Sequence, residues 1–240
     1  MTVFDNVFIP WENVFLCGET DMGGMVALTF ALYHRHSYTG CKPAVTDVLT
    51  GATALMAEVN GIEKEPHVRE KLSELICTSE LCYGAGIAAA INGYKSPSGT
   101  FVPDTMLCNV SRRHVGVNIY HEFDILADIA GGMPATLPRP GDWLSEETRP
   151  FIEKYMSRNP KVDVKDVLRA FSWVQNLSCS EWSGVMQYAG VHGGGSPRME
   201  QIAIMSAYNV ENSKNIAKRL AGIKTDKPYT FDRLGYIPNL

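Results

Sequence analysis

The sequence predicts an all-α fold, an antiparallel bundle of long helices preceded by one short strand. Three observations predict it: long apolar-rich stretches, glycine or proline where helices begin and end, and a single strand-like alternation, TVFDNVFIP at 2–10. A lone strand leaves its backbone groups unpaired. We therefore expect residues 1–16 to be a strand and linker left from a missing β domain, residues 17–222 to form the helical bundle, and residues 223–240 to form an extended tail.

The individual helices are predicted from their start and stop signals. Pro43 is expected to interrupt the first helix, because proline removes an intrahelical hydrogen bond and bends the chain. Pro66 suits the first turn of the second helix, and Ser196 is an N-cap before Pro197 in the last one. Glycine, proline and serine indicate a loop at 93–115. The expected helices cover about 21–60, 66–92, 116–130, 145–157, 163–190 and 196–222.

Composition argues against several classes of partner. The 240 residues carry a formal net charge of −4 and no run of lysine or arginine, so we expect neither nucleic acid nor a membrane surface as a partner. The N-terminus does not resemble a signal peptide, and no apolar run approaches roughly 18 residues, which indicates a cytoplasmic protein. The six cysteines are scattered, a pattern typical of reduced thiols or metal ligands rather than of disulfides.

The segment YHRHSYTGCKP, residues 33–43, concentrates reactive side chains on one helix. At 3.6 residues per turn, His34, Tyr38 and Cys41 share a face, with Lys42 at its edge. Imidazole and thiolate both bind iron and zinc. Positions i and i+7 lie about 10 Å apart along a helix axis, which suits an iron–sulfur cluster better than one small ion. The alternative is that His34 and Cys41 are ordinary packed residues.

A second motif, QYAGVHGGGSP at 187–197, combines glycines with a predicted helix start. Glycine lets the backbone approach a ligand closely, and the free N–H groups of a helix N-terminus bind anions. The alternative is a plain glycine turn between two antiparallel helices.

Other candidates carry weaker signals. The segment SRRH at 111–114 suits either a contact with a ligand phosphate or a solvated loop, and we favour the loop. Cys77 and Cys82 are interpreted as two buried thiols. His121 and Glu122 indicate only the start of a helix.

The stretches VFDNVFIPWENVF and YHRHSYTGCKPAVTDVLTG resemble the C-terminal half of the 4-hydroxybutyryl-CoA dehydratase/vinylacetyl-CoA isomerase family. That family is related to the 4-hydroxyphenylacetate 3-hydroxylases and has the acyl-CoA dehydrogenase fold, and the resemblance runs over essentially the whole chain. In the dehydratases an N-terminal CxxxC pair and a later H-x6-C pair hold a [4Fe–4S] cluster. The resemblance implies that His34 and Cys41 are the later pair, which the hydroxylase relatives lack.

The resemblance also implies roles and partners. His34 would act additionally as a general base and Tyr38 as an active-site residue, with Lys42 at the cofactor. A segment at the position of the second motif contacts the ADP portion of FAD in this fold. The residues similar to it are Gln187, Gly193, Gly194, Gly195 and Ser196. The implied partners are an acyl-CoA substrate, an N-terminal half with a CxxxC pair, and further copies in a dimer or tetramer.

Two departures from the family bear on activity. The chain has no CxxxC, since Cys77 and Cys82 are spaced as C-x4-C, so it would hold half of a cluster site and be inactive alone. Ala189 stands where the family has a carboxylate, and a second family glutamate would lie upstream of residue 1. Two alternatives therefore stay open: a flavin-dependent aromatic hydroxylase-like domain and a non-catalytic, oligomerising helical domain.

Overall fold

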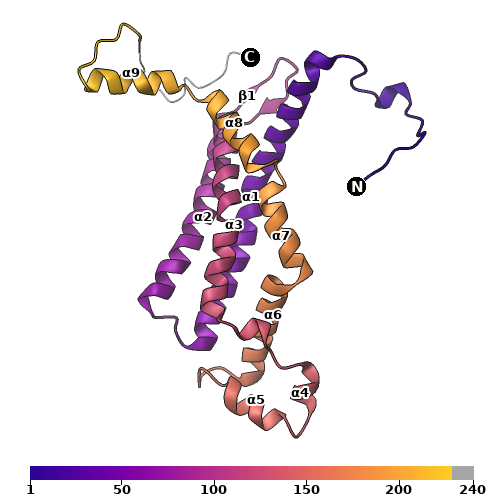
Figure 1. Cartoon of the computed structure of the whole chain (residues 1–240), viewed down its shortest axis with the longest axis vertical. Helices are drawn as coiled ribbons and strands as arrows, with labels where there is room; N and C mark the ends of the chain where they lie inside the picture. The colour runs from indigo at the N-terminus through magenta and orange to yellow at the C-terminus, as the bar shows by residue number, and fades with distance from the viewer. Residues whose placement is uncertain (229–240) are drawn as a thin grey trace.

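Three long helices pack side by side and form the body of the molecule (Figure 1). The computed structural model describes residues 1–228. α1 (Thr20–Asn60) and α2 (Pro66–Ile91) are joined by a short turn, and α3 (Thr105–Ala130) lies against both. A hairpin of β1 (Tyr94–Lys95) and β2 (Phe101–Val102) connects α2 to α3, with Tyr94 opposite Val102 in the antiparallel register.

The remaining helices line the bundle and extend beyond its two ends (Figure 1). α4 and α5 lie at the end where α1 meets α2, and α6 and α7 return along the bundle to α8 and α9. The bounds of these elements, including two short 3-10 helices, are η1 (Trp11–Asn13), η2 (Met133–Ala135), α4 (Pro140–Leu144), α5 (Arg149–Met156), α6 (Val164–Cys179), α7 (Glu181–His192), α8 (Pro197–Ala207) and α9 (Val210–Leu220).

The hydrophobic core lies in the half of the bundle where α1, α3 and α6 meet. Its fully buried members include Leu49, Met56, Leu126, Phe171 and Val174. Burying a side chain of this size contributes roughly 1.5–3 kcal/mol. This core fixes the register of α1 against α3, and that register sets which side chains meet further along the same two helices.

The predicted all-α bundle is confirmed, but the interruption at Pro43 is wrong. α1 is continuous from Thr20 to Asn60, with Pro43 buried inside it. A proline within a helix costs about 3 kcal/mol or more. Here α1 packs against α2 and α3 along much of its length, and this tertiary contact holds the helix together across the proline.

The expected N-terminal strand is also not found. Residues 2–10 form no strand, and the only strands among residues 1–228 are β1 and β2. A strand needs a neighbouring strand for its N–H and C=O groups, and residues 2–10 have no neighbouring strand among the described residues. Phe4 and Phe8 are exposed as a result.

Several predicted boundaries differ from the structure. The expected loop at 93–115 contains the hairpin and the start of α3, where Asp104 caps the helix by accepting from the Leu107 amide at 2.7 Å. The expected helix at 163–190 is divided at Ser180, and that at 196–222 is divided near Asn209. The helix expected at 145–157 corresponds to α5, with α4 before it. Most of the predicted extended tail, from residue 229 onward, lies outside the described residues.

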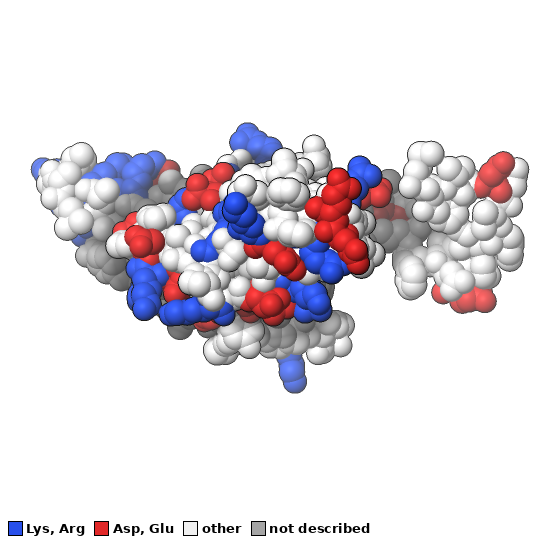
Figure 2. Space-filling model, turned by 90° about the horizontal axis from the view of Figure 1, so that it is seen from below, with Lys and Arg blue, Asp and Glu red and all other residues white. Residues whose placement is uncertain are grey.

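α2 is long and apolar enough to cross a membrane, by length and composition alone. It packs against α1 and α3 within the bundle, and core helices of soluble proteins pass the same criterion. Figure 2 shows acidic and basic side chains interspersed over the end of the bundle, with no large patch of one sign on that face.

The chain exposes far more surface than a compact protein of its size. Its accessible surface is 15762 Å², against about 10,700 Å² for a compact monomer of 26.5 kDa. The N-terminal segment, made of the residues before α1 and the first turns of α1, projects from the bundle (Figure 1). Its exposed apolar side chains include Phe8, Trp11, Phe15, Met25, Leu28 and Phe30.

Candidate functional site

The predicted site residues of α1 lie along an unbroken stretch of helix. His34 is half-buried, and its ring is parallel to that of Phe30, with centroids 6.3 Å apart. Cys41 is exposed and free. The half-buried Tyr38 points toward α7, where its hydroxyl donates a 3.1 Å hydrogen bond to the Gly190 carbonyl oxygen. Helix periodicity therefore leaves an accessible imidazole and an accessible thiol on this part of α1.

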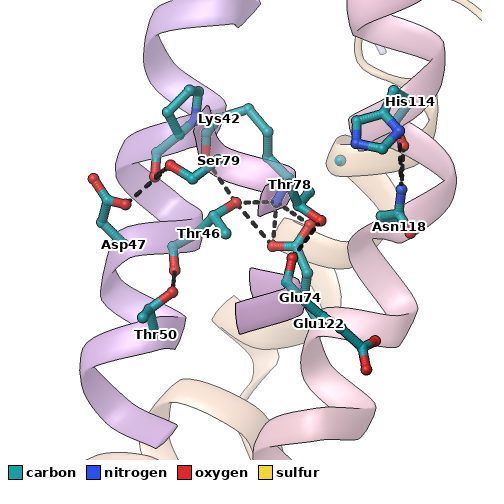
Figure 3. A network of polar contacts seen from close by, with 12 residues as sticks. Lys42, Thr46, Asp47, Thr50, Glu74, Thr78, Ser79, His114, Asn118 and Glu122 are labelled. Carbon is teal, nitrogen blue, oxygen red and sulfur yellow. Dashed lines mark hydrogen bonds and ion pairs between the residues drawn. The ribbon is translucent and has the colours of Figure 1, made fainter. Parts of the chain in front are cut away.

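Lys42 is turned into the bundle, where it forms a buried ion pair with Glu122 of α3 (Figure 3). Its Nζ lies 2.5 Å from Glu122 Oε2 and 2.7 Å from Oε1, and it donates to Thr46 Oγ1 at 2.8 Å. Thr46 donates in turn to Glu122 Oε2 at 2.9 Å. An ammonium has three N–H donors, so Thr46 and Glu122 engage all of them.

Smaller polar contacts within α1, and between α1 and α2, lie near this ion pair (Figure 3). Thr50 donates to the Thr46 carbonyl oxygen at 2.8 Å, and Ser79 donates to Asp47 Oδ1 at 3.0 Å. Ser79 also lies 3.5 Å from the Pro43 carbonyl oxygen. These contacts fix the turn of α1 that carries Lys42.

Burial sets the acid–base properties of the buried groups next to Cys41. Loss of solvent lowers the pKa of the Lys42 ammonium, and the Glu122 carboxylate offsets part of that effect. Burial also raises the pKa of the Cys82 thiol, whose sulfur accepts a hydrogen bond from Ser111 at 3.3 Å. Cys82 is therefore held as a neutral thiol, whereas Cys41 faces solvent.

The glycine-rich stretch 190–196, called here the glycine segment, lies over two buried arginines. Arg35 Nε donates to the Gly194 carbonyl oxygen at 2.9 Å, and Arg35 Nη1 donates to Asn109 Oδ1 at 2.5 Å. Arg112 Nη2 donates to the Val191 carbonyl oxygen at 3.1 Å. A Cβ atom on Gly194 would lie 2.8 Å from Arg112 Nε, so a larger residue there would force Arg112 to shift.

Glu200 of α8 completes this cluster. Its Oε1 lies 3.5 Å from Arg112 Nη1, and both side chains are almost fully buried. Burial raises the pKa of the Glu200 carboxyl, while Arg112 and Arg35 oppose that shift. Burial also raises the pKa of Tyr38 to about 12, with Arg112 again opposing it.

The predicted flavin-contact residues do not share one cavity. Gln187 lines a hollow of about 420 Å³ with the end of α3 and η2, and none of Gly193–Ser196 lines it. Gln187 Nε2 donates to Ser183 Oγ at 3.0 Å. The N-cap prediction for Ser196 is confirmed, since its Oγ accepts from the Met199 amide at 3.3 Å. The flavin role of these residues stays a prediction.

The donor set fits part of a metal cluster. No group of three or more His, Cys, Asp and Glu side chains is placed to hold a metal ion within residues 1–228. His34 and Cys41 supply one imidazole and one thiol, and both are accessible from the same side of α1. Thiolates ligate iron–sulfur clusters, and imidazole replaces them in some. The pair therefore suits half of a four-ligand site.

Sequence reasoning missed four buried charged residues: Arg35, Arg112, Glu122 and Glu200. The expectation that residues 111–114 form a solvated loop is wrong, because they belong to α3 and Arg112 is fully buried. Cys82 is buried as expected, but Cys77 is exposed. The available signal was an apolar periodicity through α3 on which Arg112, Ile119 and Glu122 fall near the buried face.

The fold and the arrangement of the site define a helical domain of the acyl-CoA dehydrogenase type. The chain belongs to the 4-hydroxyphenylacetate 3-hydroxylase (HpaB) C-terminal family, whose model matches residues 24–222. The predicted fold class and family resemblance are thereby confirmed.

Two relatives are dehydratases. The 4-hydroxybutyryl-CoA dehydratase/vinylacetyl-CoA-Δ-isomerase of Clostridium aminobutyricum is 37% identical over 232 residues, which are 93% of this chain and 47% of that protein. An oxygen-tolerant archaeal 4-hydroxybutyryl-CoA dehydratase from N. maritimus superposes with a TM-score of 0.87 at 34% identity, covering 99% of this chain and 48% of that one.

The hydroxylase branch is more distant. The oxygenase component of 4-hydroxyphenylacetate 3-monooxygenase from Thermus thermophilus is 27% identical over 238 residues, 98% of this chain and 48% of that protein. An HpaB structure with FAD and 4-hydroxyphenylacetate has a TM-score of 0.82 at 24% identity, over 92% of this chain and 46% of that one, a likeness that concerns the fold alone. The chain spans about half the length of these relatives.

Proposed function

We propose that this chain is the C-terminal half of a flavin- and [4Fe–4S]-dependent 4-hydroxybutyryl-CoA dehydratase/vinylacetyl-CoA isomerase. The observation that carries the proposal is the accessible His34 and Cys41 pair on α1, in a chain 37% identical to a protein with that activity. The hydroxylase-like alternative leaves this pair without a chemical role.

Each residue has a task that its surroundings support. The half-buried imidazole of His34 accepts a proton from the substrate, and the exposed Cys41 sulfur anchors the cluster as a thiolate. Burial keeps the Tyr38 hydroxyl protonated, so it can donate to the substrate the hydrogen bond that it gives to the Gly190 carbonyl oxygen in this structure. When bound, the flavin supplies one-electron chemistry and the cluster supplies a Lewis acid.

Lys42 acts from within the bundle. Because Thr46 and Glu122 engage its ammonium, Lys42 provides a fixed charge and an anchored helix turn beside Cys41. Its predicted cofactor role is therefore electrostatic in this proposal. The glycine segment and Ser196 at the start of α8 remain the candidate contacts of the FAD phosphates.

The large exposed apolar area of the chain suits contacts with partner chains. Burying the apolar side chains of residues 1–31 against an N-terminal half with a CxxxC pair would complete both the fold and the four-ligand set. The glycine segment would face a neighbouring copy in a dimer or tetramer. The chain alone is then colourless, free of iron and flavin, and inactive, since two ligands from one helix leave most of a cluster unprotected.

Anaerobic reconstitution tests this function. The chain is combined with an N-terminal half that carries CxxxC, together with iron, sulfide and FAD, and is assayed for conversion of vinylacetyl-CoA to crotonyl-CoA. Turnover that disappears in His34→Ala supports the proposal. A reconstituted complex that contains cluster and flavin but lacks turnover contradicts it.

Ala189 bears on the ratio of isomerase to dehydratase activity in this proposal. Isomerisation needs only proton movement, for which His34 suffices, whereas the family carboxylate at position 189 is replaced here by a methyl group. We therefore expect isomerase activity to exceed dehydratase activity in the reconstituted complex. Ala189→Glu is expected to raise dehydration relative to isomerisation, and an unchanged ratio would remove Ala189 from the account.

A further inference from the structure

The carboxyl end of α7 is capped by side chains from two other helices. The last carbonyl groups of a helix lack partners within that helix. In α7 the Gly190 carbonyl oxygen accepts from Tyr38 at 3.1 Å, and the Val191 carbonyl oxygen accepts from Arg112 at 3.1 Å. A cation at this end also interacts favourably with the helix dipole. The start of the glycine segment is therefore anchored from α1 and α3.

One guanidinium, that of Arg112, contacts three helices at once. Its Cζ lies 4.3 Å from the centroid of the Tyr38 ring, a cation–π distance, and Glu200 Oε1 lies 3.5 Å from its Nη1. The space around it is closed on two sides: a Cβ on Gly116 would lie 2.3 Å from Nη1, and one on Gly194 would lie 2.8 Å from Nε. Arg112 is therefore packed closely against Gly116 and Gly194.

The Arg112–Glu200 pair is not arranged for stability. Arg112 Nε and Nη1 and both carboxylate oxygens of Glu200 are buried without a hydrogen bond to any described residue. Buried polar groups are normally paired, and a buried charge pair without full satisfaction is often less stable than an apolar replacement. What the pair does supply is a fixed position for the Arg112 guanidinium.

We propose that Arg112, held by Glu200, is a positioning residue that couples the orientation of Tyr38 to the position of the glycine segment. The proposal rests on the proposed function, in which Tyr38 has a role at the substrate and the glycine segment is a candidate FAD contact. Gly190 and Val191 are adjacent, and one accepts from Tyr38 while the other accepts from Arg112. A ligand that displaces the glycine segment therefore moves Tyr38 in two ways. Gly190 is hydrogen-bonded to the Tyr38 hydroxyl, and Val191 is hydrogen-bonded to Arg112, which lies over the Tyr38 ring.

Two measurements on the 240-residue chain test the coupling without substrate, flavin or cluster, so they are independent of the proposed activity. Amide hydrogen exchange at Gly193 and Gly195 reports on the segment, and 13C NMR of labelled tyrosine, assigned with Tyr38→Phe, reports on the ring. Arg112→Lys keeps the charge and loses the planar fork. We expect at least tenfold faster exchange and a shifted Tyr38 signal.

The neighbouring Arg113→Lys is the matched control and is expected to change neither signal. Coupling also predicts non-additivity: Tyr38→Phe speeds the exchange in the wild-type chain and adds little in the Arg112→Lys background. Where circular dichroism shows that Arg112→Lys does not fold, Glu200→Gln carries the test, with at least threefold faster exchange expected. Wild-type exchange and ring signals in the folded variant, or effects of the two substitutions that simply multiply, would overturn the proposal.

Discussion

Lys42 of α1 and Glu122 of α3 form an ion pair with side-chain exposures of only 2% and 1%. The two residues are 80 positions apart, and their contact ties the turn that follows Cys41 to the centre of the bundle. The same core register that buries Leu49 and Leu126 brings this pair together.

Breaking the Lys42–Glu122 pair on one side is expected to cost about 3–5 kcal/mol, because the remaining charge is buried without a partner. Glu122→Gln and Lys42→Met should each lower the free energy of unfolding in urea by this amount. The double variant Lys42→Met with Glu122→Leu should lose less than the sum. The exposed pair Arg169–Asp166 is the control, since its loss is expected to cost less than about 1 kcal/mol. A Glu122→Gln variant within 1 kcal/mol of the wild type would refute the pairing.

Tyr38 is expected to make stability fall at high pH. Its pKa is about 12 in the folded chain and about 10 when unfolded. Between these values the unfolded chain has lost a proton that the folded chain keeps, so stability decreases as pH rises from 10 to 12. A shift of this size corresponds to at most about 2.7 kcal/mol; solvent screening of the half-buried side chain lowers the expected loss to about 1–2 kcal/mol, and Tyr38→Phe should remove it. Equal pH slopes for wild type and Tyr38→Phe would contradict the raised pKa of Tyr38.

Two glycines of α2 are expected to respond oppositely to alanine. A Cβ on Gly86 would lie 2.1 Å from Thr39 Oγ1, whereas nothing lies within 4 Å of one on Gly84. Gly84→Ala should stabilise the chain by roughly 0.5–1 kcal/mol through helix propensity, and Gly86→Ala should destabilise it by about 1–3 kcal/mol through overpacking. Thermal unfolding measures both. Equal effects of the two substitutions would contradict the close approach of α1 and α2 at Thr39.

The exposed apolar surface predicts self-association. On the two helices that flank the glycine segment in sequence, Trp182, Val185 and Tyr188 of α7 and Met199 and Met205 of α8 are all exposed. Exposed apolar side chains on two consecutive helices favour an interaction site there. We expect light scattering at micromolar concentration to give a dimer or tetramer, and Val185→Lys to shift it toward the monomer. A clean monomer for the unmodified chain would rule this assembly out.

The sequence predicts the helices best where their ends carry local signals. Pro66 and Ser196 mark helix starts correctly because the first-turn chemistry is contained in a few neighbouring residues. Pro43 misleads for the opposite reason, since contacts with α2 and α3 decide the path of α1. The break at Ser180 has a local signal, because its Oγ accepts from the Ser183 amide at 3.4 Å, but apolar periodicity on both sides hides it.

The residues of the candidate site likewise fall into those that the sequence places on one helix and those that only helix packing brings together. Spacing places His34, Tyr38 and Cys41 on one helix face, and their role in a site stays a prediction. The partners Glu122 and Glu200 are not predictable from spacing, because their contacts with Lys42 and Arg112 depend on how separate helices pack. Arg112 illustrates the difficulty. From the sequence a charged residue is expected to be solvated, but in the structure Arg112 contacts Tyr38, Val191 and Glu200.

The visible absorbance of the anaerobically reconstituted complex tests the central claim most directly, because it depends on Cys41 as a ligand and not on turnover. Cys77→Ala is the matched control, since Cys77 is also an exposed cysteine but lies on α2. We predict a brown chromophore with stoichiometric iron in the wild type and in Cys77→Ala, and its loss in Cys41→Ala. Full cluster absorbance in Cys41→Ala would contradict the ligand assignment and favour a structural role for His34 and Cys41.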